Sequence, residues 1–184
     1  MAIKDAQEMP QGEFEEGTTE SVRSKRMKPS RESFWSLLLD KTEEVCAEEG
    51  LALDLRVGSE GRFAKARTGV VGVMWAYAIS RNTAWVELEI RGQYRDEVYG
   101  RLSKKRNLAN QQFQSEIGER ILWDKEAHDS GRDREVYRIT SDSKYLFSDT
   151  GEEWNELVDD LTLRMVAFVK AFDSELQSIA DAKS

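Results

Sequence analysis

Apolar side chains recur at helical spacing near the start of the sequence. Phe34, Trp35 and Leu38 fall on one side of such a helix. Ser30 precedes the pattern as a residue whose side chain can accept a hydrogen bond from the first turn, and Gly50 follows it as a residue that tolerates a left-handed backbone. The pattern therefore predicts a helix between Ser30 and Gly50 with one buried face.

In the middle of the chain the period falls to two, which is typical of strands. Residues 51–57 form a short alternating stretch, and residues 70–80 are apolar on both faces, as in a central strand that is covered on both sides. Residues 84–91 alternate apolar and polar side chains after a tight turn. We expect three strands, with the glycine-containing segment 58–69 as a loop or hairpin connection between the first two.

The second half of the chain predicts two more helices and two more strands. Apolar spacing indicates helices at 94–117 and 154–179, and short strands at 121–125 and 135–140. The resulting order, αβββαββα, is typical of an α+β fold. We expect a mixed or mostly antiparallel sheet of about five strands packed against helices.

The first 29 residues have a different character from the rest. They show neither period and are rich in charged and hydroxyl side chains, which predicts a disordered polar tail before a single α+β domain at 30–182. Cys46 is the only cysteine, and its place on the apolar side of the first helix favours a buried, inert thiol. No apolar run is long enough to span a bilayer, and the N-terminus has no apolar signal region. We therefore expect a cytoplasmic protein that does not bind membranes.

Charge is distributed unevenly along the chain. The net charge of −8 opposes nonspecific attraction to nucleic acid, yet residues 56–106 carry eleven basic and five acidic side chains. The basic side chains form two runs, namely Arg62, Lys65 and Arg67, followed by Arg101, Lys104, Lys105 and Arg106. Should the runs meet at one end of the sheet, they would form a patch for phosphate groups or for an acidic protein surface. The alternative is a solvated surface paired with nearby acids.

One aromatic residue is a candidate contact for a partner. Trp85 lies on the polar face of its predicted strand, whereas Trp35, Trp75 and Trp154 occupy periodic core positions. Exposed tryptophans are common anchors of interfaces. We therefore place Trp85 with the basic side chains as a candidate binding residue.

Several features, in order along residues 30–180, are similar to a prokaryotic domain of unknown function that is often found C-terminal to restriction-endonuclease-like nuclease modules. They are the Phe34-Trp35 helix, the strand TAWVELEIRG, the helix that ends at Ile117-Gly118, the strand ILW, the Arg-rich segment before Tyr137, and Trp154 at the start of the last helix. Ile117-Gly118 stands where that family commonly has Phe-Gly. The resemblance implies an accessory role in nucleic-acid-directed or defence systems, and the nuclease activity of longer relatives is not assigned to this chain.

A catalytic alternative rests on the order of the elements. Helix, three strands, helix and strand is also the order of a restriction-endonuclease core, in which an acid and a (D/E)-x-K pair hold Mg²⁺. The third strand offers Glu87 and Glu89, with Arg91 in place of the lysine, and Asp54 on the first strand is the other candidate ligand. The competing interpretation makes Glu87 and Glu89 the solvent face of an alternating strand on a degenerate nuclease-like scaffold.

Three functional hypotheses follow. The leading one is a non-catalytic interaction module of a prokaryotic nucleic-acid-related or defence system, which binds a partner protein or nucleic acid and needs no cofactor. The first alternative is a Mg²⁺-dependent nuclease with Asp54, Glu87 and Glu89 as ligands. The second is an acidic inhibitor that competes with DNA for a DNA-binding enzyme through side chains at the start of the last helix. These are Glu152, Glu153, Glu156, Asp159 and Asp160. His128, the only histidine, is expected in an exposed loop.

Overall fold

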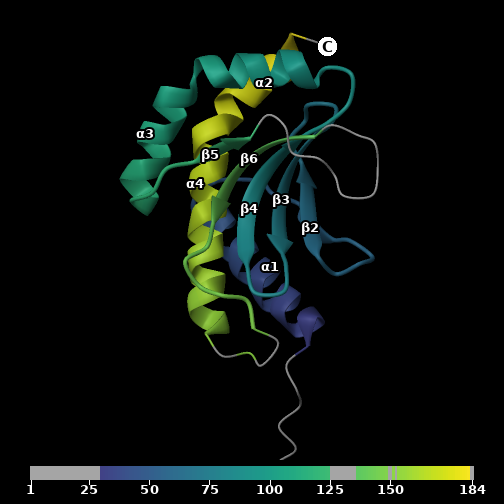
Figure 1. Ribbon diagram of the computed structural model, residues 1–184, viewed down its shortest axis with the longest axis vertical. Coiled ribbons are helices and arrows are strands. Elements are labelled where there is room, and N and C mark those ends of the chain that lie inside the picture. Colours follow the sequence, from purple (N-terminus) through teal and green to yellow (C-terminus); the bar gives the residue numbers. More distant parts are fainter. Residues whose placement is uncertain (1–29, 125–135, 149–150, 152, 183–184) are drawn as a thin grey trace, which may run out of the picture.

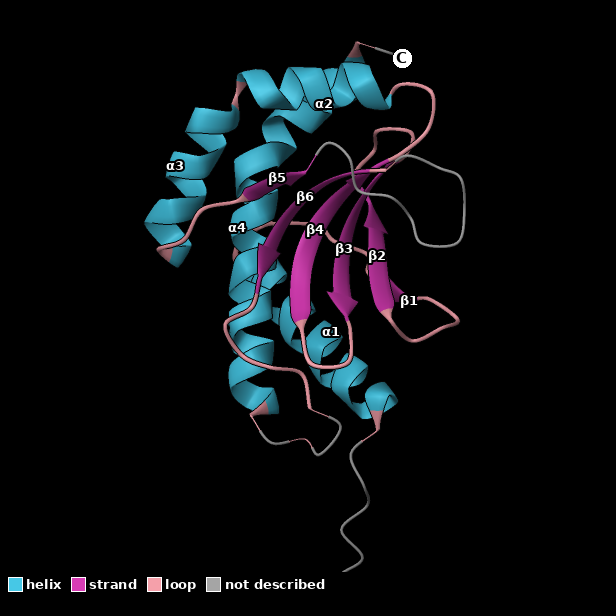
Figure 2. Cartoon of the chain, in the orientation of Figure 1, coloured by secondary structure: helices cyan, strands magenta, loops and turns pink. Residues whose placement is uncertain are grey.

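The computed structural model describes residues 30–124, 136–148, 151 and 153–182. Within these residues it contains four helices and six strands, shown in Figures 1 and 2. The helices are α1 (Arg31–Glu48), α2 (Arg95–Lys104), α3 (Arg106–Ile117) and α4 (Trp154–Asp181). The strands are β1 (Arg56–Val57), β2 (Phe63–Arg67), β3 (Val73–Ile79), β4 (Ala84–Ile90), β5 (Leu122–Asp124) and β6 (Tyr137–Asp142). The predictions for residues 1–29, His128 and Glu152 lie outside the described residues.

All described strands belong to one sheet with the order β1-β2-β3-β4-β6-β5. Every neighbouring pair is antiparallel. Strands β1 to β4 follow one another as a meander, and β6 then pairs with β4 while β5 forms the far edge. The predicted α+β class is confirmed, with one strand more than expected and with antiparallel pairing throughout the described sheet.

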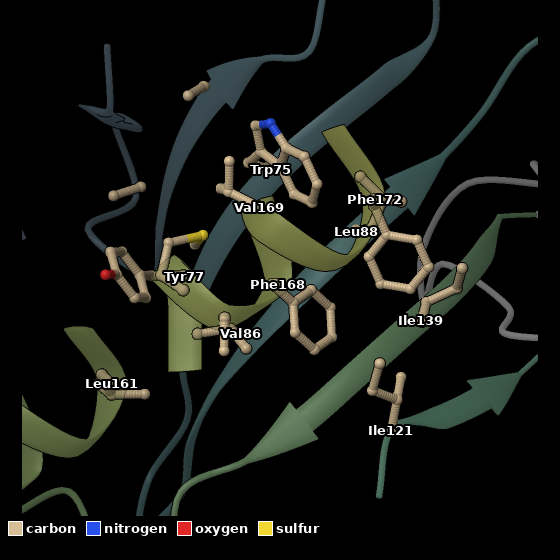
Figure 3. Packing of buried hydrophobic residues seen from close by; sticks show 14 of the residues in the cluster. Trp75, Tyr77, Val86, Leu88, Ile121, Ile139, Leu161, Phe168, Val169 and Phe172 are labelled. Carbon is tan, nitrogen blue, oxygen red and sulfur yellow. The ribbon is translucent and has the colours of Figure 1, made fainter. Parts of the chain in front are cut away.

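Helices α1 and α4 cover one face of the sheet, and α3 packs against α4 (Figure 1). Alternate side chains of the central strands point into this layer, where they meet the aromatic rings of α4 (Figure 3). Examples are Leu88 on β4 and Ile139 on β6 with Phe168 and Phe172 on α4, each at most 1% exposed. One continuous apolar core therefore lies between the sheet and the helices.

The first helix begins and ends where the sequence predicts. The Ser30 hydroxyl accepts a hydrogen bond from the Ser33 amide at 3.2 Å, which satisfies one free donor of the first turn. At the other end Gly50 has a φ of 68°, and the Leu51 amide donates to the Cys46 carbonyl at 2.8 Å. This closing turn fixes Leu51 against the end of α1.

The largest difference from the sequence prediction is the strand β2, which lies inside the segment expected to be a loop. Its buried face consists of Ala64 and Ala66, which are 0% and 2% exposed. Alanine gives only a weak hydrophobic signal, so the alternation of Phe63, Lys65 and Arg67 with these residues resembles a charged loop. The strand predicted at 51–57 is correspondingly shorter, because only Arg56 and Val57 pair.

The helix predicted at 94–117 is divided in two. Lys105 leaves helical geometry, with φ −98° and ψ 5°, and its amide closes a tight turn on the Leu102 carbonyl at 2.9 Å. The break lets α2 cross the end of the sheet while α3 runs along α4 (Figure 1). Gly118 ends α3 with a φ of 82°, as its position in the sequence predicts.

Candidate functional site

The face of the sheet opposite the helices carries charged side chains, which the strand register places in rows. Lys65, Ala76 and Glu87 are neighbours across β2, β3 and β4. The next row places Glu89 beside Arg138 of β6. Glu87 and Glu89 are only 0% and 2% exposed, so the prediction that they form a solvent-exposed strand face is wrong.

Cations and an indole hold these buried carboxylates. Glu89 pairs with the Lys65 ammonium at 2.8 Å and with Arg91 Nε at 2.6 Å. Glu87 Oε2 accepts a hydrogen bond from the indole Nε1 of Trp85 at 2.8 Å and lies 3.6 Å from Arg138 Nε. Trp85 is half-buried, and its indole N–H supports this network.

The carboxylate of Glu87 has fewer hydrogen-bond and charge partners than that of Glu89. Its second oxygen, Oε1, is buried and accepts no hydrogen bond from a described residue. Burial raises the pKa of the Glu87 carboxyl, and the Trp85 hydrogen bond and the Arg138 charge oppose the rise only in part. The face is therefore a charge network with one incompletely compensated acid.

The three candidate magnesium ligands are not brought together as a metal site. Asp54 lies on the segment before β1, where its side chain is 75% exposed and pairs with Arg56 at 2.8 Å. Across the described part of the chain, no group of three or more acidic, histidine or cysteine side chains has the arrangement of a metal site. The geometry therefore does not support the magnesium-site alternative.

The two basic runs lie toward opposite edges of the sheet, so the condition for a single patch is not met. The Arg106 guanidinium lies over the ring of Trp123 on β5, at 5.6 Å, whereas Lys65 and Arg67 belong to β2. Four strand spacings separate β5 from β2, which amounts to roughly 19 Å. Arg101 pairs with Glu175 of α4 at 3.1 Å, so it serves helix packing.

The acidic start of α4 is also partly committed to the fold. Asp160 accepts hydrogen bonds from the Ser143 hydroxyl at 2.6 Å and from Arg164 Nε at 2.7 Å. Arg164 is 1% exposed and makes two further bonds to Glu119, at 2.8 and 2.9 Å. Of the predicted acidic contacts within the described residues, Glu153, Glu156 and Asp159 remain exposed.

A concavity lies at the β2 side of the molecule. A cleft of about 1100 Å³ opens between α1, the segment before β1, and the strand β2. Its lining combines the apolar side chains Leu39, Leu51, Leu53, Leu55 and Met74 with the basic side chains Arg56, Lys65 and Arg67 and the acidic side chains Glu43 and Asp54. A smaller cavity of about 260 Å³ next to it includes Arg62. The first of the two predicted basic runs therefore borders these cavities, while the second does not.

The cleft exists because the pairing between β1 and β2 is short. Strand β1 pairs with β2 over two residues, and the segment 51–55 before it takes no part in the sheet. Leu51 is tied to the end of α1, and Leu53 and Leu55 pack their side chains against the core. The segment follows the helix instead of the strand, which leaves space beside Arg67.

Cys46 borders the cleft from α1 as a buried, free thiol, as the sequence predicts. Burial raises the pKa of this thiol above its usual value. The thiol form predominates at neutral pH, so the geometry gives Cys46 no nucleophilic role.

The fold and the cleft define the class of this protein as a two-layer α+β protein with a cleft at one side of its sheet. The chain belongs to the family described as Domain of unknown function (DUF4268), which matches residues 30–175. The match confirms the part of the resemblance that concerns a domain of unknown function. No curated protein and no solved structure matches the chain. Among the described helices, none is both long and apolar enough to cross a membrane.

Proposed function

We propose that this protein is a non-catalytic interaction module that binds a partner protein at the cleft beside β2. The observation that carries the proposal is the cleft itself, which combines leucine side chains with the basic side chains of Lys65 and Arg67. Pockets of this size with a few polar groups on an apolar lining are typical binding sites. The resemblance to domains that accompany nuclease modules supports a cytoplasmic, prokaryotic nucleic-acid-related or defence system as the setting.

Charge pairing favours a protein over nucleic acid as the partner at this site. Lys65 and Arg91 are paired with the buried Glu89, and Arg138 lies beside Glu87, so these cations are not available to track a phosphate backbone. The net charge of −8 also opposes long-range attraction to a polyanion. Leucine side chains in a cleft gain free energy from an apolar partner but not from phosphates.

The test is capture of a partner from extracts of the source cells by the immobilised chain. Arg62 and Arg67 are exposed and form no ion pair with a described residue, so Arg62→Glu/Arg67→Glu reverses the charge of the site without breaking the fold. The matched control is Lys104→Glu/Lys105→Glu, on the far side of the sheet. We expect a protein that the wild type and the control retain and that the Arg62/Arg67 variant loses. Equal retention by all three chains would contradict the proposal.

A second candidate function, phosphate binding, is favoured by one observation at the junction of α2 and α3. Lys104, Lys105 and Arg106 are exposed, and the two lysines form no ion pair with a described residue. Fluorescence anisotropy of labelled duplex and single-stranded DNA at two salt concentrations tests it. Binding that weakens with salt and is lost in the Lys104/Lys105 variant would support it, whereas salt-independent or absent binding would contradict it.

A further inference from the structure

The outer edge of β2 is covered only in part. Strand β1 pairs with Ala64 and Lys65, and the ladder ends there. Strand β2 itself continues to Arg67, which still pairs with Met74 of β3 on the other side. Among the described residues, the last part of β2 therefore has one neighbouring strand instead of two.

The alternation of the ladder determines which main-chain groups face this edge. The Gly58 amide donates to the Phe63 carbonyl at 2.9 Å, so Phe63 and every second residue after it direct their main-chain groups toward β1. The Arg62 carbonyl instead accepts from Ile79 of β3, also at 2.9 Å. The N–H and C=O of Arg67 consequently point outward, into the cleft beyond the end of β1.

We propose that the cleft binds an extended segment of a partner protein that adds a strand to β2 at Arg67. This inference rests on the proposed function and defines the segment that the partner supplies. Main-chain hydrogen bonds along a free sheet edge provide affinity, and pockets for alternate side chains provide specificity.

The two faces of the sheet define the chemistry of the segment. A side chain opposite Arg67 lies on the face of the sheet that is opposite the helices. There it is next to the Arg67 guanidinium, which is exposed and pairs with no described acid, so this position selects an acidic residue. The flanking side chains point toward α1, where Leu39 lines the cleft, so these positions select apolar residues. The ligand is therefore a strand of alternating apolar and acidic side chains.

The chain itself contains this pattern beside the cleft. Leu53, Asp54 and Leu55 alternate apolar and acidic side chains, and a continued β1 ladder would place Asp54 opposite Arg67. The ladder stops instead, and Asp54 pairs with Arg56 at 2.8 Å. The edge of β2 at Arg67 therefore matches a strand of alternating apolar and acidic side chains, but the chain's own segment 53–55 does not pair with it.

The first experiment measures fluorescence anisotropy of two labelled nine-residue peptides, one alternating leucine with aspartate and one alternating leucine with lysine, titrated with the full chain. The wild type is expected to bind the aspartate peptide. Arg67→Glu is expected to weaken that binding about tenfold and to bind the lysine peptide instead, since reversing one charge of the pair reverses the preference. A preference that does not change with residue 67 would overturn the proposal.

The second experiment separates main-chain pairing from charge. Arg67→Pro removes the outward N–H, while the β2–β3 hydrogen bonds remain because Arg67 faces Met74 as a non-hydrogen-bonded pair. Arg67→Ala removes the same charge and keeps the N–H. We expect the proline variant to bind the aspartate peptide more weakly than the alanine variant, with unchanged circular dichroism in both. Equal binding by the two variants overturns strand addition.

The outcomes also separate this inference from the proposed function. Strand addition is wrong if neither peptide binds while the cellular partner is still retained by the wild type and lost from the Arg62/Arg67 variant. In that case the proposed interaction site still stands. If neither peptide binds and no partner depends on Arg62 and Arg67, both proposals are overturned.

Discussion

At the scale of single residues, the most informative side chains are charged groups buried in the sheet. Glu87 and Glu89 lie two residues apart on the same strand, yet their surroundings differ. Within the part of the chain that the structure describes, Glu89 has two cations within 3 Å, whereas Glu87 has an indole donor, an arginine at 3.6 Å and one oxygen without a hydrogen bond. Burial of a carboxylate costs free energy unless charges and donors offset it. The two residues should therefore contribute to stability with opposite signs.

Glu87→Gln is expected to raise the free energy of unfolding at pH 7 by on the order of 1 kcal/mol. The folded-state pKa of Glu87 is raised, so the fold favours the protonated carboxyl, and stability falls as the pH rises from the unfolded-state pKa through the folded-state pKa. Glutamine is neutral at every pH and still accepts from Trp85. The gain should therefore shrink as the pH is lowered toward 4, and urea unfolding at several pH values measures it.

Glu89→Gln is the matched control, because it removes the charge that Lys65 and Arg91 share. It should lower stability at pH 7, by about 3 kcal/mol, since two cations lose their buried partner. A destabilised Glu87→Gln variant at pH 7 would show that Arg138 compensates Glu87 more fully than the geometry indicates.

Arg164 is the buried charge that sequence reasoning missed. Its position in α4 lies between apolar positions, but its guanidinium joins Asp160, Glu119 and the Ser141 hydroxyl at distances of 2.7–2.9 Å. Arg164→Ala should lower the free energy of unfolding by about 3 kcal/mol, because it removes the cation that pairs with Asp160 and Glu119 and the donor to the Ser141 hydroxyl. Guanidinium unfolding measures this loss: a lower free energy of unfolding with an unchanged m value would confirm the prediction, and a loss below about 1 kcal/mol would contradict it.

At the scale of elements, the sequence predicted those with strong periodicity. Helices α1 and α4 and strands β3 and β4 follow from runs of large apolar side chains with one clear period. Strand β2 could not be predicted in this way because alanine buries little surface, so its period is hidden by the charges of Lys65 and Arg67. The strand predicted at 51–57 includes β1 but is too long, because the leucines of 51–55 pack against the core instead of pairing with β2. The basic side of the cleft was visible as a charge run, but the cleft itself depends on where the ladder stops.

Two glycines in the connections of the sheet, Gly72 and Gly92, test how closely neighbouring elements approach each other. Gly72 has a φ of 81°, its carbonyl accepts from the Arg91 amide at 2.7 Å, and an added Cβ would lie 2.3 Å from the Arg91 carbonyl oxygen. Gly92 has a similar φ of 85° but open space around it. Gly92→Ala should cost only the left-handed strain of about 1–2 kcal/mol. Gly72→Ala should cost roughly 2 kcal/mol more, because β2, β3 and β4 must shift. Thermal unfolding of both variants tests this order, and equal losses would contradict it.

At the scale of the whole molecule, the sheet separates two different chemical environments. The helical layer contains the apolar core, and the opposite face holds its acids in ion pairs with Lys65, Arg91 and Arg138. The cleft lies where these two environments meet, beside α1 on one side and Lys65 and Arg67 on the other. A partner bound there would contact both an apolar wall and a charged strand, which suits a peptide better than an inorganic ion or a polyanion.

This division leads to a prediction about catalysis. Pure protein incubated with Mg²⁺ or Mn²⁺ should leave plasmid DNA and single-stranded RNA uncleaved, because cations already occupy Glu89 and because Asp54 pairs with Arg56 on a separate segment. Magnesium requires several oxygen ligands that converge on one point, and cations bound to those oxygens compete with it. Gel electrophoresis over a range of metal concentrations is the measurement, with Glu89→Ala as the matched variant. Metal-dependent cleavage that disappears in Glu89→Ala would show that the Lys65–Glu89–Arg91 network rearranges into a catalytic site, and the nuclease hypothesis would then replace the interaction module.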